Sequence, residues 1–138
     1  PISQIQAFTP ALLQALGSDQ IHALSDDQLR ALTASQFAAL DPGQIQTLTT
    51  NQVVALGSEE IGALTDAQVD AMTSAQIHAL TVEQIPVLTT ANVAVLDNNQ
   101  LSALTTDQLS VFTTDQIAAL DGVQRAFLST DQLQALGL

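Results

Sequence analysis

The chain has 138 residues, 46% of them hydrophobic, which is enough apolar material for the core of one ordinary domain. Fourteen acidic residues face only two basic ones, Arg30 and Arg125, and the net charge of −12 makes nucleic acid and anionic lipid unsuitable partners. The absence of cysteine excludes disulfides and thiolate metal sites, and no apolar run reaches the roughly 20 residues of a membrane span.

The chain is a tandem repeat with a period of eight residues and no insertion from end to end. Every eighth residue from Phe8 to Leu136 is large and apolar, and fourteen of these seventeen residues are leucine. A second apolar column lies three residues earlier and is interrupted only by Arg125. A mostly alanine column precedes the leucine, and glutamine precedes the second apolar column in fourteen of the seventeen octads. The unit therefore has the form T-x-x-Q-I-x-A-L.

Each octad carries a strong helix start signal. The Thr, Ser or Asp after the leucine is a typical N-cap, and the glutamine three residues later completes a capping box, as Thr65 and Gln68 illustrate. Pro10 and Pro42 fall at the first helical position, where proline is tolerated. All the acids except Asp70 lie between N-cap and N3, where the helix dipole favours them. A helix of about six residues is therefore predicted after each cap, beginning at Thr9 and ending with the one that follows Ser129.

Two other folds fit a period of eight less well. In one continuous helix the apolar pattern would rotate by roughly 80° per octad, so no straight hydrophobic seam would form. A β-solenoid favours β-branched residues and regular glycine corners, whereas the repeated interior here is Gln, Ala and Leu. Isolated six-residue helices are unstable, so packing between octads must stabilise them. The sequence predicts an all-α solenoid or superhelix of about 17 short helices, forming a single domain over residues 1–138.

A longer period of forty residues runs through the octads. Departures from the threonine cap recur at Gly17, Gly57, Asp97 and Gly137, and the alanine column departs at Thr47, Val87 and Phe127. Two explanations are possible. Either a segment of five octads was duplicated, or five octads complete one or two whole turns of a superhelix. The sequence does not choose between them.

No group of residues in the sequence predicts catalysis, a cofactor or a metal site. His22 and His78 both occupy the position between the second apolar column and the alanine column, and this position is expected to face solvent. The acids Asp26, Asp27, Glu59 and Glu60 show no calcium-loop spacing and are explained as helix-start residues. A triad drawn from Ser25, His22 and Asp26 is disfavoured because Ser25 is already required as a cap. We therefore expect a non-enzymatic protein.

Five residues are irregular or stand out as candidate contacts. Pro86 falls late in its octad and is expected to distort that helix. We expect Phe127 to turn inward and Arg125 to turn outward, toward Asp121. The possible interaction residues are Arg30, Asp70 and Arg125, and Arg30 and Asp70 belong to a variable, solvent-facing column that also holds Gln14 and Val54.

The octads T-T-D-Q-I-A-A-L at 113–120 and T-S-A-Q-I-H-A-L at 73–80 resemble the L-T-x-x-Q-[ILV]-x-x-L octapeptide-repeat arrays of long, acidic, secreted or surface proteins of bacteria. The resemblance covers essentially the whole chain. It implies a segment of a longer array and favours an extracellular or cell-surface location.

Three functions remain open at this point. The first is a structural spacer or protein-interaction scaffold whose exposed ends associate with a protein partner or with a second copy. The second is a module that binds a peptide or protein in a solenoid groove. The third is an ice-binding array of threonines, although the free exchange of Thr with Ser, Asp and Gly in the column favours capping.

Overall fold

The computed structural model describes residues 2–138, with side chains described from Gln4 onward. Across this range the secondary structure is entirely helical, with one short helical element in each octad and no strand. The elements are α1 Ile2–Ile5, α2 Pro10–Gln14, α3 Ser18–His22, α4 Asp26–Ala31, α5 Ala34–Ala38, α6 Pro42–Thr47, α7 Thr50–Ala55, α8 Ser58–Gly62, α9 Asp66–Ala71, α10 Ser74–Ala79, the 3-10 helix η1 Ile85–Val87, α11 Thr90–Ala94, α12 Asn98–Ala103, α13 Thr106–Ser110, α14 Thr114–Ala119, α15 Gly122–Phe127 and α16 Thr130–Ala135.

The predicted capping boxes are confirmed. Before α9, the backbone N–H of Gln68 donates to Thr65 Oγ1 over 3.1 Å, and the N–H of Thr65 donates to Gln68 Oε1 over 2.9 Å. At Gly17, which has no side chain, only the second half of the box forms, from the glycine N–H to Gln20 Oε1. Each box fixes the start of a helix at the same place in its octad.

The leucine column ends the helices. At Leu56 the backbone turns to φ −64° and ψ 135°, which is extended rather than helical, and the Leu56 N–H donates to the carbonyl of Val53. Leu32, Met72 and Leu104 behave in the same way, and the N-cap that follows each of them is extended too, as an N-cap requires. The chain therefore stops and restarts a helix in every octad and does not form one long helix.

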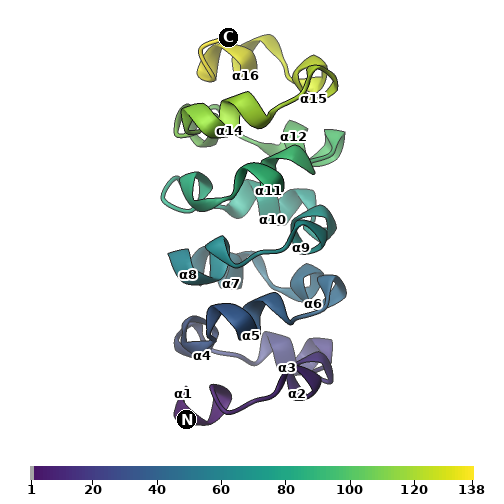
Figure 1. Ribbon diagram of the computed structural model, residues 1–138, viewed down its shortest axis with the longest axis vertical. Coiled ribbons are helices and arrows are strands. Elements are labelled where there is room, and N and C mark those ends of the chain that lie inside the picture. Colours follow the sequence, from purple (N-terminus) through teal and green to yellow (C-terminus); the bar gives the residue numbers. More distant parts are fainter. Residues whose placement is uncertain (1) are drawn as a thin grey trace.

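The short helices wind into a superhelix whose turns stack along one axis (Figure 1). Most helices pack against the one three octads later, as α6 does against α9 and α11 against α14. Hydrogen bonds described below join helices four octads apart, so one turn takes between three and four octads. Five octads are therefore neither one whole turn nor two. The superhelical explanation of the forty-residue period is wrong, and the duplication explanation remains.

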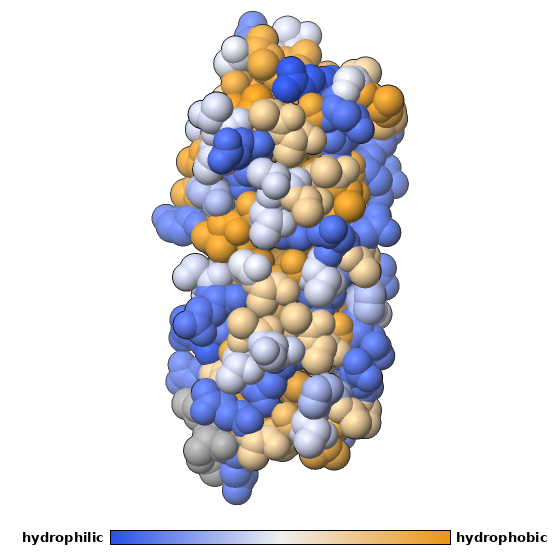
Figure 2. All heavy atoms as spheres, viewed as in Figure 1, coloured by the Kyte–Doolittle hydropathy of each residue, from blue (hydrophilic) through white to orange (hydrophobic). Residues whose placement is uncertain are grey.

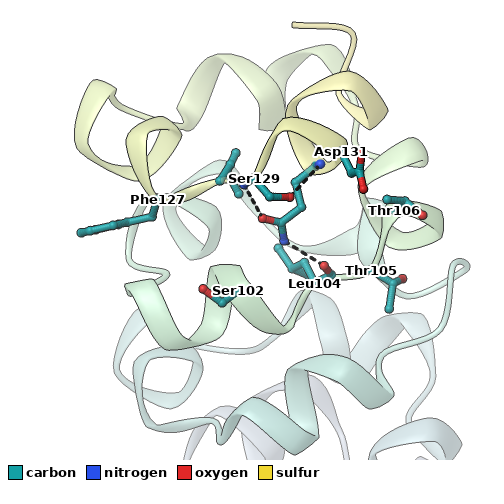
Figure 3. Close-up of a pocket in the computed structure, with 9 residues that line it drawn as sticks. Ser102, Leu104, Thr105, Thr106, Phe127, Ser129 and Asp131 are labelled. Atoms are coloured by element: carbon teal, nitrogen blue, oxygen red, sulfur yellow. Dashed lines mark hydrogen bonds between the residues drawn. The ribbon is translucent and has the colours of Figure 1, made fainter.

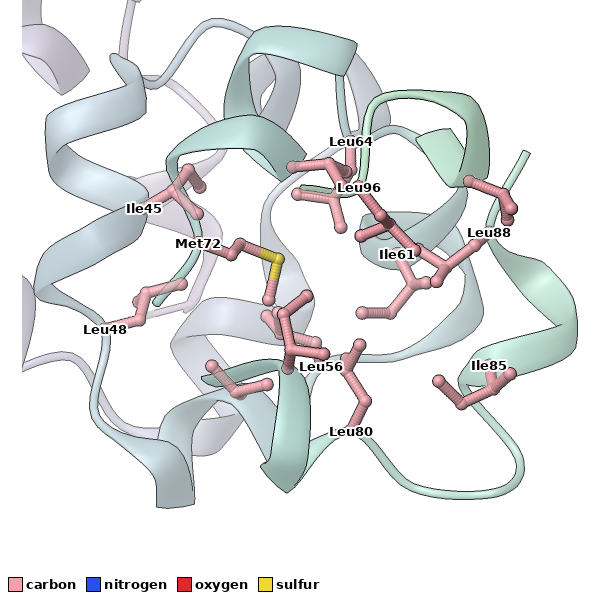
Figure 4. Packing of buried hydrophobic residues seen from close by; sticks show 14 of the residues in the cluster. Ile45, Leu48, Leu56, Ile61, Leu64, Met72, Leu80, Ile85, Leu88 and Leu96 are labelled. Atoms are coloured by element: carbon pink, nitrogen blue, oxygen red, sulfur yellow. The ribbon is translucent and has the colours of Figure 1, made fainter. Parts of the chain in front are cut away.

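The two apolar columns form one continuous core along the axis. Buried members run from Ile5 in the first turn to Leu136 in the last. Figure 4 shows how the columns interlock, with Met72 pointing in among Ile45, Leu48 and Leu56. Alanines of the small-residue column are partly buried against this core. On the face shown in Figure 2, hydrophilic residues lie along both sides and are mixed with hydrophobic ones between them. Because each octad contributes its own share, the core grows in proportion to the number of repeats.

Pro86 distorts its octad as predicted. The segment forms only the three-residue 3-10 helix η1, because proline lacks an N–H and crowds the preceding turn. The capping pair of this octad survives, with the Gln84 N–H donating to Thr81 Oγ1 over 3.2 Å and the Thr81 N–H donating to Gln84 Oε1 over 2.9 Å. Ile85 and Leu88 remain buried. The distortion is therefore confined to the hydrogen bonding of the helix itself.

Capping gives a first testable prediction. Thr65→Ala is expected to lower the free energy of unfolding by about 0.5 to 2 kcal/mol, because the N–H of Gln68 loses its acceptor. Thr65→Asp restores a cap acceptor and is expected to be nearly neutral, as Asp97 already caps α12 in the same way. Urea unfolding of the three proteins measures both effects. Equal damage from alanine and aspartate would show that the threonine does not act as a cap.

Candidate functional site

The glutamine column is the most specific polar feature of the structure. From Gln36 onward every member is buried, including Glu60 and Asn92, which replace glutamine. The side-chain oxygen of Gln68 accepts from the cap N–H, and its Nε2 donates to the carbonyls of Phe37 and Leu40 at 3.0 and 2.8 Å. These carbonyls lie at the end of α5, in the preceding turn of the superhelix. One side chain thus satisfies the start of one helix and the end of another.

Every buried glutamine of the column makes the same link. Gln100 donates to Val69 and Met72, and Gln132 donates to Leu101 and Leu104, in each case to residues 31 and 28 positions earlier. Figure 3 shows the last of these, where a dashed line reaches the carbonyl of Leu104. The last carbonyls of a helix have no partner within that helix, so the glutamine amide satisfies groups that would otherwise be buried unpaired.

Sequence reasoning found only half of this role. A capping box accepts Glu as readily as Gln, so the box alone does not explain fourteen glutamines against one glutamate in the column. The amide has a donor that a carboxylate lacks. The preference for glutamine was the signal that a second hydrogen-bond partner exists. The partner lies 28 to 31 residues earlier in the chain, and this separation depends on the number of octads in each turn of the superhelix.

A second link between turns lies on the outer surface. Nε2 of Gln14 donates to the carbonyl of Ala39 over 2.8 Å, and His78 Nδ1 lies 3.1 Å from the carbonyl of Ala103, each 25 residues further along. His22 meets the carbonyl of Thr47 in the same way. Both histidines are exposed, as predicted, and each hydrogen-bonds to a backbone carbonyl of the following turn. Side chains of the variable, solvent-facing column thus also link successive turns of the superhelix at several positions.

The three possible interaction residues do not come together. Arg30 lies on α4 and pairs with Asp27 on its own helix, with 3.1 Å between Nη2 and Oδ1. Asp70 is exposed near the end of α9, and Arg125 lies on α15, so the three residues belong to different turns. They do not form one site.

The predicted arrangement of Arg125 and Phe127 is wrong. Phe127 is 44% exposed, and Arg125 is partly buried, with Nε and Nη2 donating to the carbonyls of Leu120 and Ile117 over 3.1 and 3.0 Å. Asp121 accepts instead from the N–H of Gln124 as the cap of α15. The long arginine stem can lie along the core while its guanidinium reaches backbone acceptors. Ile117 and Leu120 hold the positions whose carbonyls accept from a column glutamine elsewhere in the stack.

Shallow cavities lie between turns on the surface. One of about 480 Å³ is lined by residues that include Ser102, Thr106, Phe127 and Asp131, and Phe127 points away from it at the rim (Figure 3). Another of about 500 Å³ lies between α11 and α14 and is lined by Thr90, Asp115 and alanines.

The serine of the suggested triad has a structural role. Ser25 Oγ accepts from the N–H of Gln28, so the serine of the suggested triad is occupied as a cap. Among residues 2–138 no three histidine or acidic side chains lie close enough to hold a metal ion. In that same part of the chain, no helix combines the length and apolar character needed to cross a membrane.

Comparison with known proteins identifies the repeat. A family model described as the ALTTAQ repeat matches residues 3–34, 34–66, 66–98 and 85–122. No curated protein and no solved structure matches the chain. The first match spans four octads, which is the distance along the chain over which a column glutamine reaches back to the preceding turn.

Proposed function

Because the chain belongs to the ALTTAQ repeat family, we propose that it is a non-enzymatic structural spacer or protein-interaction scaffold, part of a large bacterial surface or secreted protein. The observation that carries this proposal is the glutamine link, which joins each turn to the one before it by buried hydrogen bonds. A stack with a continuous core and regular links has a length set by its number of repeats and resists bending between turns. These are the properties that a spacer needs.

Small-angle X-ray scattering tests the spacer. The chain is compared with a variant in which residues 49–88 are duplicated in tandem, which adds five octads in register. We expect the maximum dimension to grow in proportion to the added residues while the radius of the cross-section stays unchanged. A longer array that becomes thicker or more compact would contradict a rigid spacer.

Glutamine amides in the first turn and backbone carbonyls in the last turn support a scaffold that associates with further copies of itself. In the first described turn, Gln20 and Gln28 are less buried than the later members of the column. In the last turn, the carbonyls of Leu128 and Leu136 hold positions that accept from a column glutamine in earlier turns. A further turn, from the same chain or from a second copy, would complete both sets of bonds. Sedimentation velocity is expected to show concentration-dependent association that Gln20→Glu with Gln28→Glu weakens, whereas a strict monomer at high concentration would contradict self-association.

Protein binding through the exposed column is a second candidate. It is favoured by the exposure of Gln14, Arg30, Val54 and Asp70, whose side chains vary more than those of the two apolar columns. Capture of a specific partner should be lost in an Arg30→Ala, Asp70→Ala double variant and kept in a Ser110→Ala control, since Ser110 is exposed in the same column. Equal capture by both variants would exclude this column.

Ice binding is the remaining alternative. It predicts that ice crystals grow more slowly in a solution of the protein than in buffer alone, and equal growth rates would exclude it.

A further inference from the structure

Glu60 is the one acid in the glutamine column, and it breaks the link that the column otherwise makes. Its side chain is 2% exposed, as deeply buried as the glutamines above and below it. In residues 4–138 every other buried member of the column donates a hydrogen bond to the preceding turn, and Glu60 donates none. The joint between α4 and α8 therefore differs from its neighbours.

The surroundings of Glu60 show which half of the glutamine role survives. Glu60 Oε2 accepts from the N–H of Gly57 over 2.9 Å, so the capping half is intact. A Cβ atom on residue 57 would lie 2.9 Å from this oxygen, so the glycine leaves room for the carboxyl group. The carbonyls of Leu29 and Leu32 occupy the positions 31 and 28 residues earlier that accept from a glutamine in other turns. An ionised carboxylate has no proton to donate to them, whereas a protonated one has a single O–H.

Few charged groups surround this carboxyl. Glu59 lies beside it on α8, and Arg30 of α4 lines the same cavity of about 330 Å³ together with Gly57, Ser58 and both glutamates. The other charged residues of α4 are Asp26 and Asp27, of which Asp27 pairs with Arg30. The elements packed against α8 three octads away, α5 and η1, contain no titratable residue.

Burial raises the pKa of Glu60 above the ordinary 4.5 of a glutamate. The backbone N–H groups of Glu60 and Gly57 act in the opposite direction, Glu59 raises the pKa, and Arg30 lowers it. The folded chain thus holds this proton to a higher pH than the unfolded chain does. The stability that the proton contributes is complete below pH 4.5 and is lost as the pH rises through the folded pKa.

We propose that Glu60 makes the joint between α4 and α8 a pH-dependent contact in an otherwise uniform stack. When the carboxyl is protonated, its O–H donates to the carbonyl of Leu29 or Leu32 and closes the turn. When it is ionised, the carboxylate faces backbone oxygens and the turn opens more readily. The proposal goes beyond the scaffold function, because it places one flexible point at a defined position along the array.

Hydrogen exchange with mass spectrometry tests the joint. The wild type is compared with Glu60→Gln, which restores the amide donor, and with Glu59→Gln, which removes a neighbouring exposed acid. At pH 7.5, peptides covering residues 25–32 and 57–64 should exchange about tenfold more slowly in Glu60→Gln than in the wild type, the equivalent of about one hydrogen bond. The ratio of the exchange rate in the wild type to that in Glu60→Gln should approach one at pH 4.5. The corresponding ratio for Glu59→Gln should stay near one at both pH values. A ratio that does not change with pH would overturn the proposal.

A carbon NMR titration gives an independent measurement. The chain has only three glutamates, Glu59, Glu60 and Glu83, so glutamate labelled at its carboxyl carbon gives three signals. The signal that disappears in Glu60→Gln should titrate above 4.5, and titration at or below 4.5 would overturn the proposal. Gln68→Glu should create a second such joint, with faster exchange in residues 37–40 at pH 7.5 that acidification reverses. Exchange in Gln68→Glu that acidification leaves unchanged would also overturn it.

Discussion

Gln68→Leu is expected to lower the free energy of unfolding by about 2 to 6 kcal/mol. Leucine has nearly the same volume but neither accepts from the N–H of Thr65 nor donates to the carbonyl of Leu40. Two backbone groups next to a side chain that is 1% exposed would then be left without partners, at about 1 to 3 kcal/mol each. Urea unfolding measures the difference.

Gln46→Leu is the matched control, because Gln46 is an exposed glutamine of the outer column. We expect its effect to stay within about 0.5 kcal/mol. If the two substitutions had equal effects, the link between turns would contribute nothing to stability. If Gln68→Leu were neutral, hydrophobic burial alone would hold the turns together.

Phe37→Ala is expected to destabilise the chain by about 3 to 5 kcal/mol. The ring of Phe37 is fully buried, at 0% exposure. Phe37 is the member of the second apolar column that lies in α5, and its removal leaves a cavity along the axis of the superhelix. Phe127→Ala removes the same ring from a position that is 44% exposed and should change stability by no more than about 0.5 kcal/mol.

The same urea experiment compares these two phenylalanines. A large loss in Phe127→Ala would mean that its ring is buried in solution, as the sequence prediction had it. A small loss of stability in Phe37→Ala would mean that the second apolar column does not form the core. The pair separates residue type from position, because only the place of the ring differs.

Local features of the fold could be predicted from the sequence because their causes lie within one octad. Thr65 and Gln68 are three residues apart, and the box they form needs no information about other turns. Pro86 acts on its own helix, and its effect could likewise be predicted from its position. The apolar columns predicted the core because their spacing matches the face of a short helix.

Features that depend on the pitch of the superhelix could not be predicted. The donor half of Gln68 reaches residues 28 to 31 positions away, and no local rule gives that separation. The pitch also decided between the two explanations of the forty-residue period. Arg125 was misplaced because its acceptors are the carbonyls of Ile117 and Leu120, whose availability follows from the glutamine pattern and not from the charge of Asp121.

The most direct test of this account is the hydrogen exchange of glutamine side-chain amides measured by solution NMR. The account predicts slow exchange for the amides of Gln68, Gln76 and Gln100, which are buried and bonded to the preceding turn, and fast exchange for the exposed Gln46. Equal, solvent-like exchange for all four would contradict the link between turns.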